Sequence, residues 1–104
     1  MSYIRSFLFI PADSEKKLSK ADNAGADAII LDLEDSVALG RKGDARELCS
    51  AFLKERPHAA RPYQIWVRVN PVQSGFLNDD LDAVLDGMPD GIVFPKPDLS
   101  LIHI

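Results

Sequence analysis

Residues 28–35 of this chain read Ala28-Ile-Ile-Leu-Asp-Leu-Glu-Asp35, an apolar run that passes directly into three acids. An uninterrupted apolar run of this kind, placed shortly after Gly25, is typical of a strand buried on both faces in a parallel sheet. The acids follow at the carboxyl end of that strand. In barrel and doubly wound folds, this end carries the loops that bring reacting groups together. The run therefore predicts a buried parallel strand whose acids either serve a functional site or only begin the next helix.

The composition of the chain excludes several classes of protein. The chain has 104 residues, a formal net charge of -4 and 46% hydrophobic residues, which suits one small domain or part of a larger one. Mild acidity without a basic stripe argues against a nucleic acid partner. The apolar runs are too short to cross a bilayer and the first residues lack signal-peptide order, so we expect a cytoplasmic protein without a membrane partner. The lone Cys49 excludes an internal disulfide and is expected to be a buried structural thiol.

Four expected strands alternate with helical segments. The strands are predicted at residues 4–10, 28–33, 64–69 and 92–94. The helices are expected after a cap at Asp13 or Ser14, over residues 41–54 with a start delayed by Gly43, and after a cap at Asn78 or Asp79. This βαβαβαβ order predicts an α/β fold with parallel strands and right-handed crossovers.

Two architectures satisfy this order, a TIM (β/α)8 barrel and an open doubly wound sheet. Four strands cannot close a barrel, so the barrel interpretation makes this chain a truncated first half. The turn after the first strand, Pro11-Ala-Asp-Ser14, lacks the glycines of a phosphate-binding turn. We therefore favour the first half of a TIM barrel and expect its fourth strand to leave an open, apolar edge.

The last residues, Leu99-Ser-Leu-Ile-His-Ile104, do not fit the preceding pattern. They are also the direct translation of the end sequence of a transposase adapter used in preparing sequencing libraries. We therefore expect residues 1–98 to form the N-terminal half of a barrel domain and residues 99–104 to be a non-native read-through tail. The alternative is the natural start of a further element, and the codons of the source DNA distinguish the two.

Polar residues follow each of the four expected strands, as in a barrel enzyme. The four strand ends are Pro11-Ala-Asp13, Asp32-Leu-Glu-Asp35, Arg68-Val-Asn-Pro71 and Pro95-Lys96. In this order and spacing, residues 4–98 resemble the HpcH/HpaI aldolase and citrate lyase β-subunit-like family. Any one of these motifs is weak, whereas the acidic run followed by Arg-Val-Asn and then Pro-Lys is specific.

The resemblance implies a TIM-barrel, magnesium-dependent carbon–carbon lyase. Such relatives act on 3-hydroxy-acyl thioesters, including citryl-CoA and malyl-CoA, carried by coenzyme A or an acyl carrier protein. A cation beside the developing oxyanion stabilises the enolate that the cleavage forms. The resemblance places the Mg2+ ligands beyond residue 98, with none in this fragment, so we expect the fragment to be inactive and the full-length parent to be a homo-oligomer. The alternatives are a pyruvate-class 2-oxo acid aldolase on the same barrel and a small non-catalytic α/β binding module.

The resemblance places Arg68 at the position of the family's substrate-binding arginine. This role suits arginine, since a guanidinium fork can hold a carboxylate by two hydrogen bonds. Its alternative role is a structural ion pair with Glu34 or Asp35. These two acids could bind a metal directly, since hard cations favour carboxylates. The resemblance instead implies that Glu34 and Asp35 position Arg68 or a water. Lys96 is expected to pair with this acidic cluster in a structural role.

Phe9, Lys20 and Arg5 are the candidate coenzyme A contacts that the resemblance implies. Lys20 would meet a phosphate as a point charge. The alternatives are core packing for Phe9 and a solvated helix face for Lys20. Relatives often carry glycine and arginine where this chain has Ala12 and Ser14, and the missing arginine weakens the coenzyme A assignment.

Overall fold

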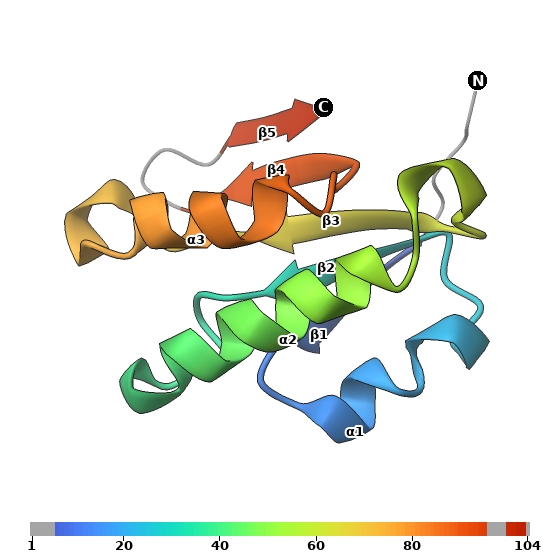
Figure 1. Cartoon of the computed structure of the whole chain (residues 1–104), viewed down its shortest axis with the longest axis horizontal. Coiled ribbons are helices and arrows are strands. Elements are labelled where there is room, and N and C mark those ends of the chain that lie inside the picture. Colours follow the sequence, from blue (N-terminus) through green and yellow to red (C-terminus); the bar gives the residue numbers. More distant parts are fainter. Residues whose placement is uncertain (1–5, 96–99, 104) are drawn as a thin grey trace.

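The computed structural model describes residues 6–95 and 100–103 of the chain. Five strands form one sheet in these residues, and helices connect the first four (Figure 1). The strands are β1 (Phe7–Pro11), β2 (Ala28–Asp32), β3 (Gln64–Arg68), β4 (Gly91–Phe94) and β5 (Ser100–His103). The α-helices are α1 (Glu15–Leu18), α2 (Lys42–Lys54) and α3 (Leu77–Leu85), and the 3-10 turns are η1 (Ala21–Asn23), η2 (Leu39–Arg41), η3 (His58–Ala60) and η4 (Val72–Ser74).

The strands β1 to β4 are parallel, and each pairs with the next one in the chain. The helices α1, α2 and α3 lie on the same side of this sheet (Figure 1). Sequential parallel strands with helices on one side are the arrangement of consecutive βα units in a barrel, whereas a doubly wound sheet carries helices on both sides. The predicted α/β fold with parallel βαβαβαβ order is confirmed.

The main core fills the layer between the sheet and the helices. Alternate residues of the strands point into it because side chains alternate between the two faces of a strand. It contains Ile29 and Leu31 of β2, Ile65 and Val67 of β3, and Ala45, Cys49, Leu53 and Val84 of the helices. Burial raises the pKa of the Cys49 thiol, with the nearby Asp80 charge adding to the effect. Cys49 is thus a free, buried and unreactive thiol, as predicted.

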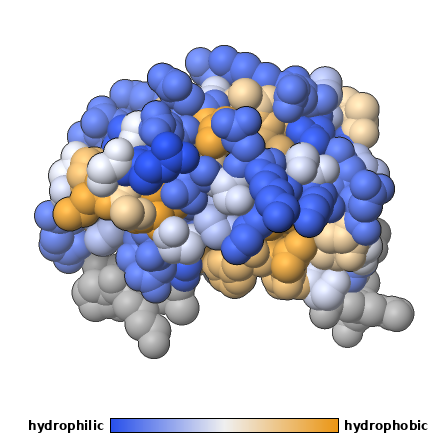
Figure 2. Space-filling view, turned by 90° about the horizontal axis from the view of Figure 1, so that it is seen from below, coloured by the Kyte–Doolittle hydropathy of each residue, from blue (hydrophilic) through white to orange (hydrophobic). Residues whose placement is uncertain are grey.

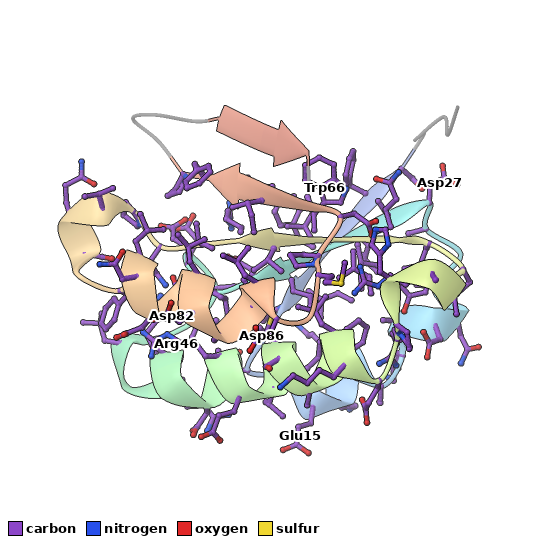
Figure 3. The ribbon with its side chains drawn as sticks, turned by 45° about the horizontal axis from the view of Figure 1, so that its top comes forward. Glu15, Asp27, Arg46, Trp66, Asp82 and Asp86 are labelled. Carbon is purple, nitrogen blue, oxygen red and sulfur yellow. The ribbon has the colours of Figure 1, made fainter. Side chains whose placement is uncertain are left out.

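A smaller apolar cluster lies on the side of the sheet without helices, and it contains Ala28, Ile30, Trp66 and Val93. Figure 3 shows Trp66 on this side, away from α2. The Trp66 ring covers Gly91 so closely that a Cβ at residue 91 would overlap it. The ring of Phe7 meets Trp66 edge-on, with 6.4 Å between centroids. These contacts bury β2 on both faces, as its sequence predicted.

Two helix starts differ from the prediction. Helix α2 begins at Lys42, so Gly43 does not delay it, and Arg41 Nη1 donates to Asp44 Oδ2 at 2.7 Å across its first turn. Helix α3 begins at Leu77, before the predicted caps Asn78 and Asp79. The chain turns into α3 through Ser74, whose Oγ accepts from the Phe76 N–H at 3.0 Å, and no side chain caps the helix. The predicted cap of α1 is Ser14, which accepts from the Lys17 N–H.

The expectation of an open edge at the fourth strand is wrong. Strand β5 pairs antiparallel with β4, from Gly91 opposite His103 to Phe94 opposite Ser100. No side-chain pattern predicted this pairing, because an antiparallel strand pairs through backbone groups and needs no particular side-chain pattern. The read-through origin of residues 99–104 stays a prediction, and residues 99 and 104 lie outside the described part.

The surface is mostly hydrophilic, with smaller hydrophobic areas between the polar ones, on the face shown in Figure 2. The large apolar residues of β1 contribute exposed area, since Phe7 and Phe9 are both about half exposed. Within residues 6–95 and 100–103, no helix has the length and apolar character needed to cross a membrane.

Candidate functional site

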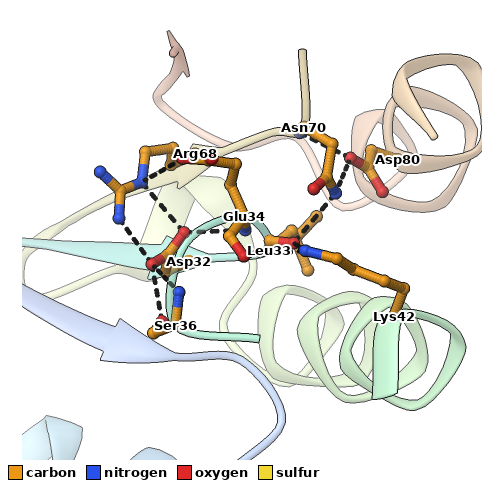
Figure 4. Close-up of polar contacts among 8 residues, drawn as sticks. All are labelled: Asp32, Leu33, Glu34, Ser36, Lys42, Arg68, Asn70 and Asp80. Carbon is orange, nitrogen blue, oxygen red and sulfur yellow. Dashed lines mark hydrogen bonds and ion pairs between the residues drawn. The ribbon is translucent and has the colours of Figure 1, made fainter. Parts of the chain in front are cut away.

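The carboxyl ends of β2 and β3 bring Asp32 and Arg68 together. The two residues are direct partners in the parallel register, on the side of the sheet without helices. Arg68 Nε donates to Asp32 Oδ1 at 3.0 Å and Nη2 donates to Oδ2 at 2.6 Å (Figure 4). The Asp32 side chain is 2% exposed and that of Arg68 is 22% exposed. The pair is bidentate and charge-assisted, which makes it a strong kind of side-chain contact.

Both oxygens of Asp32 are fully used. Oδ1 also accepts from the Glu34 N–H at 2.9 Å, and Oδ2 accepts from the Ser36 N–H at 3.1 Å and the Ser36 hydroxyl at 2.6 Å. Burial raises the pKa of Asp32, but the hydrogen bonds from Arg68, Ser36 and Glu34 outweigh it and lower this pKa to about 2. Asp32 is therefore ionised at neutral pH, and its contacts suit it to orient Arg68.

Arg68 is held along one edge of its guanidinium group. Its hydrogen bond to Asp32 raises the pKa of Arg68, so the side chain stays charged. The Phe9 ring packs against it, with 4.9 Å from Cζ to the ring centroid. Within the described residues, Arg68 Nη1 donates no hydrogen bond to any group. The edge formed by Nη1 and Nη2 is thus available to an external carboxylate.

Glu34 and Asp35 lie beside this pair with looser contacts. Glu34 Oε1 is 3.8 Å from Arg68 Nε, beyond hydrogen-bond distance, and Asp35 is exposed. Burial raises the pKa of Glu34, and repulsion from Asp35 adds to the shift. The predicted positioning role of these two acids stays a prediction, while the principal partner of Arg68 is Asp32. Strand alternation places residues 28, 30 and 32 on the face of Trp66 and Arg68, but the register of β2 against β3 is needed to select Asp32 as the partner.

The described residues do not assemble a metal site by themselves. No three His, Cys, Asp or Glu side chains gather to hold a metal ion within residues 6–95 and 100–103. Asp32 would have to give up the hydrogen bonds of Arg68 or Ser36 to become a ligand. Arg5 and Lys96, two residues with predicted roles, lie outside the described part of the chain.

A hollow of about 310 Å³ lies beside β1. Its walls come from β1 and from the α1–η1 segment, and its lining residues are Leu8, Phe9, Ile10, Lys17, Lys20, Ala21 and Ala24. The structure thus brings the two predicted coenzyme A contacts, Phe9 and Lys20, to one surface and adds Lys17. Two lysines beside apolar lining residues can bind an anionic group attached to an apolar chain.

The family model described as HpcH/HpaI aldolase/citrate lyase matches residues 5–100. The chain belongs to this family. It is 41% identical over 92 residues to a (3S)-malyl-CoA thioesterase of Cereibacter sphaeroides, covering 88% of this chain and 32% of that protein. It is 38% identical over 96 residues to the citrate lyase subunit beta of Escherichia coli, covering 92% of this chain and 31% of the relative. The human mitochondrial citramalyl-CoA lyase is 34% identical over 94 residues, covering 88% and 27%.

Two solved structures are similar to this chain. CitE from Mycobacterium tuberculosis, in complex with magnesium, acetoacetate and coenzyme A, matches with a TM-score of 0.69 and 35% identity over 88% of this chain and 32% of that chain. RipC from Yersinia pestis matches with a TM-score of 0.62 and 30% identity, covering 91% of this chain and 35% of that chain. The chain spans about a third of the length of the curated relatives it matches.

Proposed function

We propose that this chain is the N-terminal part of a magnesium-dependent carbon–carbon lyase acting on a 3-hydroxy-acyl thioester such as citryl-CoA or malyl-CoA. One observation carries the proposal. At the carboxyl ends of the parallel strands, Asp32 fixes one edge of the Arg68 guanidinium, and no group within residues 6–95 and 100–103 hydrogen-bonds to Nη1 on the other edge. In a barrel of this class, reacting groups gather at that end.

Arg68 is the residue to which we assign substrate binding. Such thioesters carry a carboxylate near the hydroxyl-bearing carbon, and cleavage turns that part into a 2-oxo acid. In the reaction the hydroxyl loses its proton, the carbon–carbon bond breaks, and its electron pair becomes the enolate of the thioester, which then takes up a proton. A charged, oriented guanidinium would hold the carboxylate still throughout. The CitE structure with oxaloacetate and magnesium supports a 2-oxo acid as the ligand class.

The hollow beside β1 supports a thioester carrier as the rest of the substrate. Phe9 contacts Arg68 and also lines the hollow, so the two proposed subsites share this side chain. Lys17 and Lys20 would meet the phosphates of coenzyme A. Arg5 is a third candidate for the same anion. Magnesium would supply charge stabilisation of the enolate, but the described residues do not hold it alone, and we assign them no step through the metal.

A pyruvate-class 2-oxo acid aldolase is the second candidate, because the CitE structure with magnesium and pyruvate shows a free 2-oxo acid bound by a relative. A requirement for a thioester separates the two candidates. A non-catalytic binding module would bind such ligands without turnover.

The test is a chimera in which residues 5–98 replace the matched segment of human citramalyl-CoA lyase, assayed for acetyl-CoA formation. We expect an active chimera and no activity from the 104-residue chain alone. Arg68→Lys should lower kcat/KM by roughly 100-fold, because lysine cannot hold both Asp32 and a carboxylate in a fork.

The matched control is Arg56→Lys. Arg56 forms a bidentate pair of the same kind with Asp22, at 3.0 and 2.9 Å, near the opposite end of the strands. Its substitution should leave kcat/KM within about twofold of the parent chimera, since it lies away from the proposed site. Equal losses from the two substitutions would overturn the assignment of Arg68.

A further inference from the structure

Two backbone N–H groups directly after β2, those of Leu33 and Glu34, donate hydrogen bonds to the Arg68–Asp32 pair. The Leu33 N–H donates to the Arg68 carbonyl at 2.9 Å, and the Glu34 N–H donates to Asp32 Oδ1 at 2.9 Å. The two N–H groups therefore fix the backbone of the arginine and the carboxylate of its partner. Any movement of these two peptide units would move both members of the pair.

The carbonyl groups of the same two residues are held from the opposite side (Figure 4). Lys42 Nζ donates to the Leu33 carbonyl at 2.9 Å and to the Glu34 carbonyl at 2.8 Å. Asn70 Nδ2 also donates to the Leu33 carbonyl, at 2.9 Å. All four backbone groups of Leu33 and Glu34 are thus hydrogen-bonded. Side chains from α2 and from the segment after β3 donate to the two carbonyls, and the Val37 N–H also donates to the Glu34 carbonyl at 3.2 Å.

The burial of Lys42 is not explained by a contribution to the stability of α2. It is 6% exposed and is the first residue of α2, where a cation opposes the helix dipole. Within the described residues it forms no ion pair with a carboxylate, and burying a charge without one is costly. Its ammonium group instead donates hydrogen bonds to two consecutive backbone carbonyls after β2, which indicates a role in fixing that backbone.

Asn70 is fixed in turn by buried Asp80 of α3. Asp80 Oδ2 accepts from the Asn70 backbone N–H at 2.8 Å and from Asn70 Nδ2 at 2.7 Å. Asp80 Oδ1 accepts from Arg46 Nε at 2.8 Å, which joins α2 to α3. Within the described residues, every buried side-chain polar atom has a hydrogen-bond partner, so this network leaves no buried group unsatisfied.

We propose that Lys42 and Asn70 are positioning residues, which act on Arg68 by clamping the carbonyls of Leu33 and Glu34. Without the clamp, the two N–H groups lose their fixed positions, and the guanidinium loses the orientation that leaves one edge free. The consequence for substrate binding rests on the proposed function, whereas the consequence for the Arg68–Asp32 pair does not.

The test is Lys42→Met in the 104-residue chain, followed by NMR measurement of hydrogen exchange at Arg68 Nε–H. Methionine keeps the shape and burial of the stem and removes both hydrogen bonds. We expect Arg68 Nε–H to exchange about tenfold faster relative to the backbone amides of β3, since a hydrogen bond from a charged group contributes about that factor. Unchanged relative exchange would overturn the proposal.

Two controls separate positioning from stability. Lys54→Met removes an exposed lysine at the other end of α2 and should leave the Arg68 exchange unchanged. Leu53→Ala removes a buried core side chain and should accelerate the β3 amides and Arg68 Nε–H together. If Lys42→Met does not fold, the same substitution is measured in a Gly43→Ala background, because Gly43 has open space around it and alanine favours a helix.

A titration with oxaloacetate separates this inference from the proposed function. Binding to the wild-type chain that weakens about tenfold in Lys42→Met, with faster Arg68 exchange, supports both proposals. Faster exchange without any oxaloacetate binding to the wild-type chain supports the clamp and counts against the proposed site. Unchanged exchange counts against the clamp whatever the affinity.

Discussion

Asp32, the direct partner of Arg68 across the parallel register of β2 and β3, binds one edge of the Arg68 guanidinium group, and no other described residue hydrogen-bonds to that group. An arginine enclosed on every side by carboxylates would be a structural ion pair. One that is oriented on a single edge and 22% exposed can exchange water for a carboxylate ligand without losing its orientation. The geometry shows an ion pair whose main partner is Asp32 rather than the expected Glu34 or Asp35, and it leaves substrate binding by Arg68 as a prediction.

Asp32→Asn should lower the free energy of unfolding at pH 7 by about 2 kcal/mol. The folded-state pKa of Asp32, about 2, lies below its ordinary value of 3.8, so its stabilising effect is present above pH 4 and is lost as pH falls toward 2. The difference between wild type and variant should therefore shrink over that range. Urea unfolding at several pH values measures it. Asp44→Asn, at an exposed position of α2, is the control, and a difference independent of pH would contradict the assignment.

Asp35→Asn should lower the pKa of Glu34. Burial and the Asp35 charge raise the pKa of Glu34 above its ordinary value of 4.5, so ionisation of Glu34 costs stability as pH rises through this range. Removing the neighbouring charge removes one of these causes. The measurement is the carboxyl 13C chemical shift of Glu34 as a function of pH. Asp79→Asn on α3 should leave that titration unchanged, and an equal shift in both variants would refute the repulsion between Glu34 and Asp35.

Lys20→Ala should weaken the binding of coenzyme A by roughly threefold to tenfold, because it removes a cation worth about 1 kcal/mol at a partly exposed site. Lys20 lines the hollow beside β1. Lys16→Ala is the matched control, since Lys16 lies on α1 but does not line the hollow. Calorimetric titrations at low and high salt should show the difference shrinking as salt rises. Equal affinities of the two variants would remove the hollow as the carrier site.

Gly91→Ala should destabilise the chain by roughly 1–3 kcal/mol, because a methyl group there overlaps the Trp66 ring and forces the ring off its position. Gly43→Ala provides the contrast, since nothing lies near its Cβ position and alanine in a helix is favoured by about 0.5 kcal/mol. Thermal unfolding of both variants measures the two effects. A neutral Gly91→Ala would show that the tryptophan side of the sheet repacks freely.

The regular alternation of apolar runs and amphipathic segments predicted the parallel sheet and its helices correctly. The strands pair in chain order, so local patterns contained most of the information. The start of α3 was missed because the turn at Ser74 and Gly75 sets it, with Gly75 in the left-handed region at φ 81°, and this turn outweighs the caps expected at Asn78 and Asp79.

The site was predicted only in part for a different reason. Arg68 could be selected from the sequence, because an arginine at the end of an apolar strand has few purely structural roles. Its partner Asp32 does not stand out, because three acids follow one another and only the register of β2 against β3 selects among them. The contacts of Lys42 with the backbone carbonyls have no sequence signature, since a lysine that binds carbonyl groups resembles any lysine at the start of a helix.

Strand β5 occupies the edge of β4 in the antiparallel direction. The backbone groups of β4 along that edge are the same ones that a parallel strand would need, and each can pair with only one neighbour at a time. Extending the parallel sheet past β4 therefore requires residues 100–103 to leave first. β5 and any further parallel strand would therefore compete for the same edge of β4. Removing residues 99–104 should favour pairing with the parallel strand.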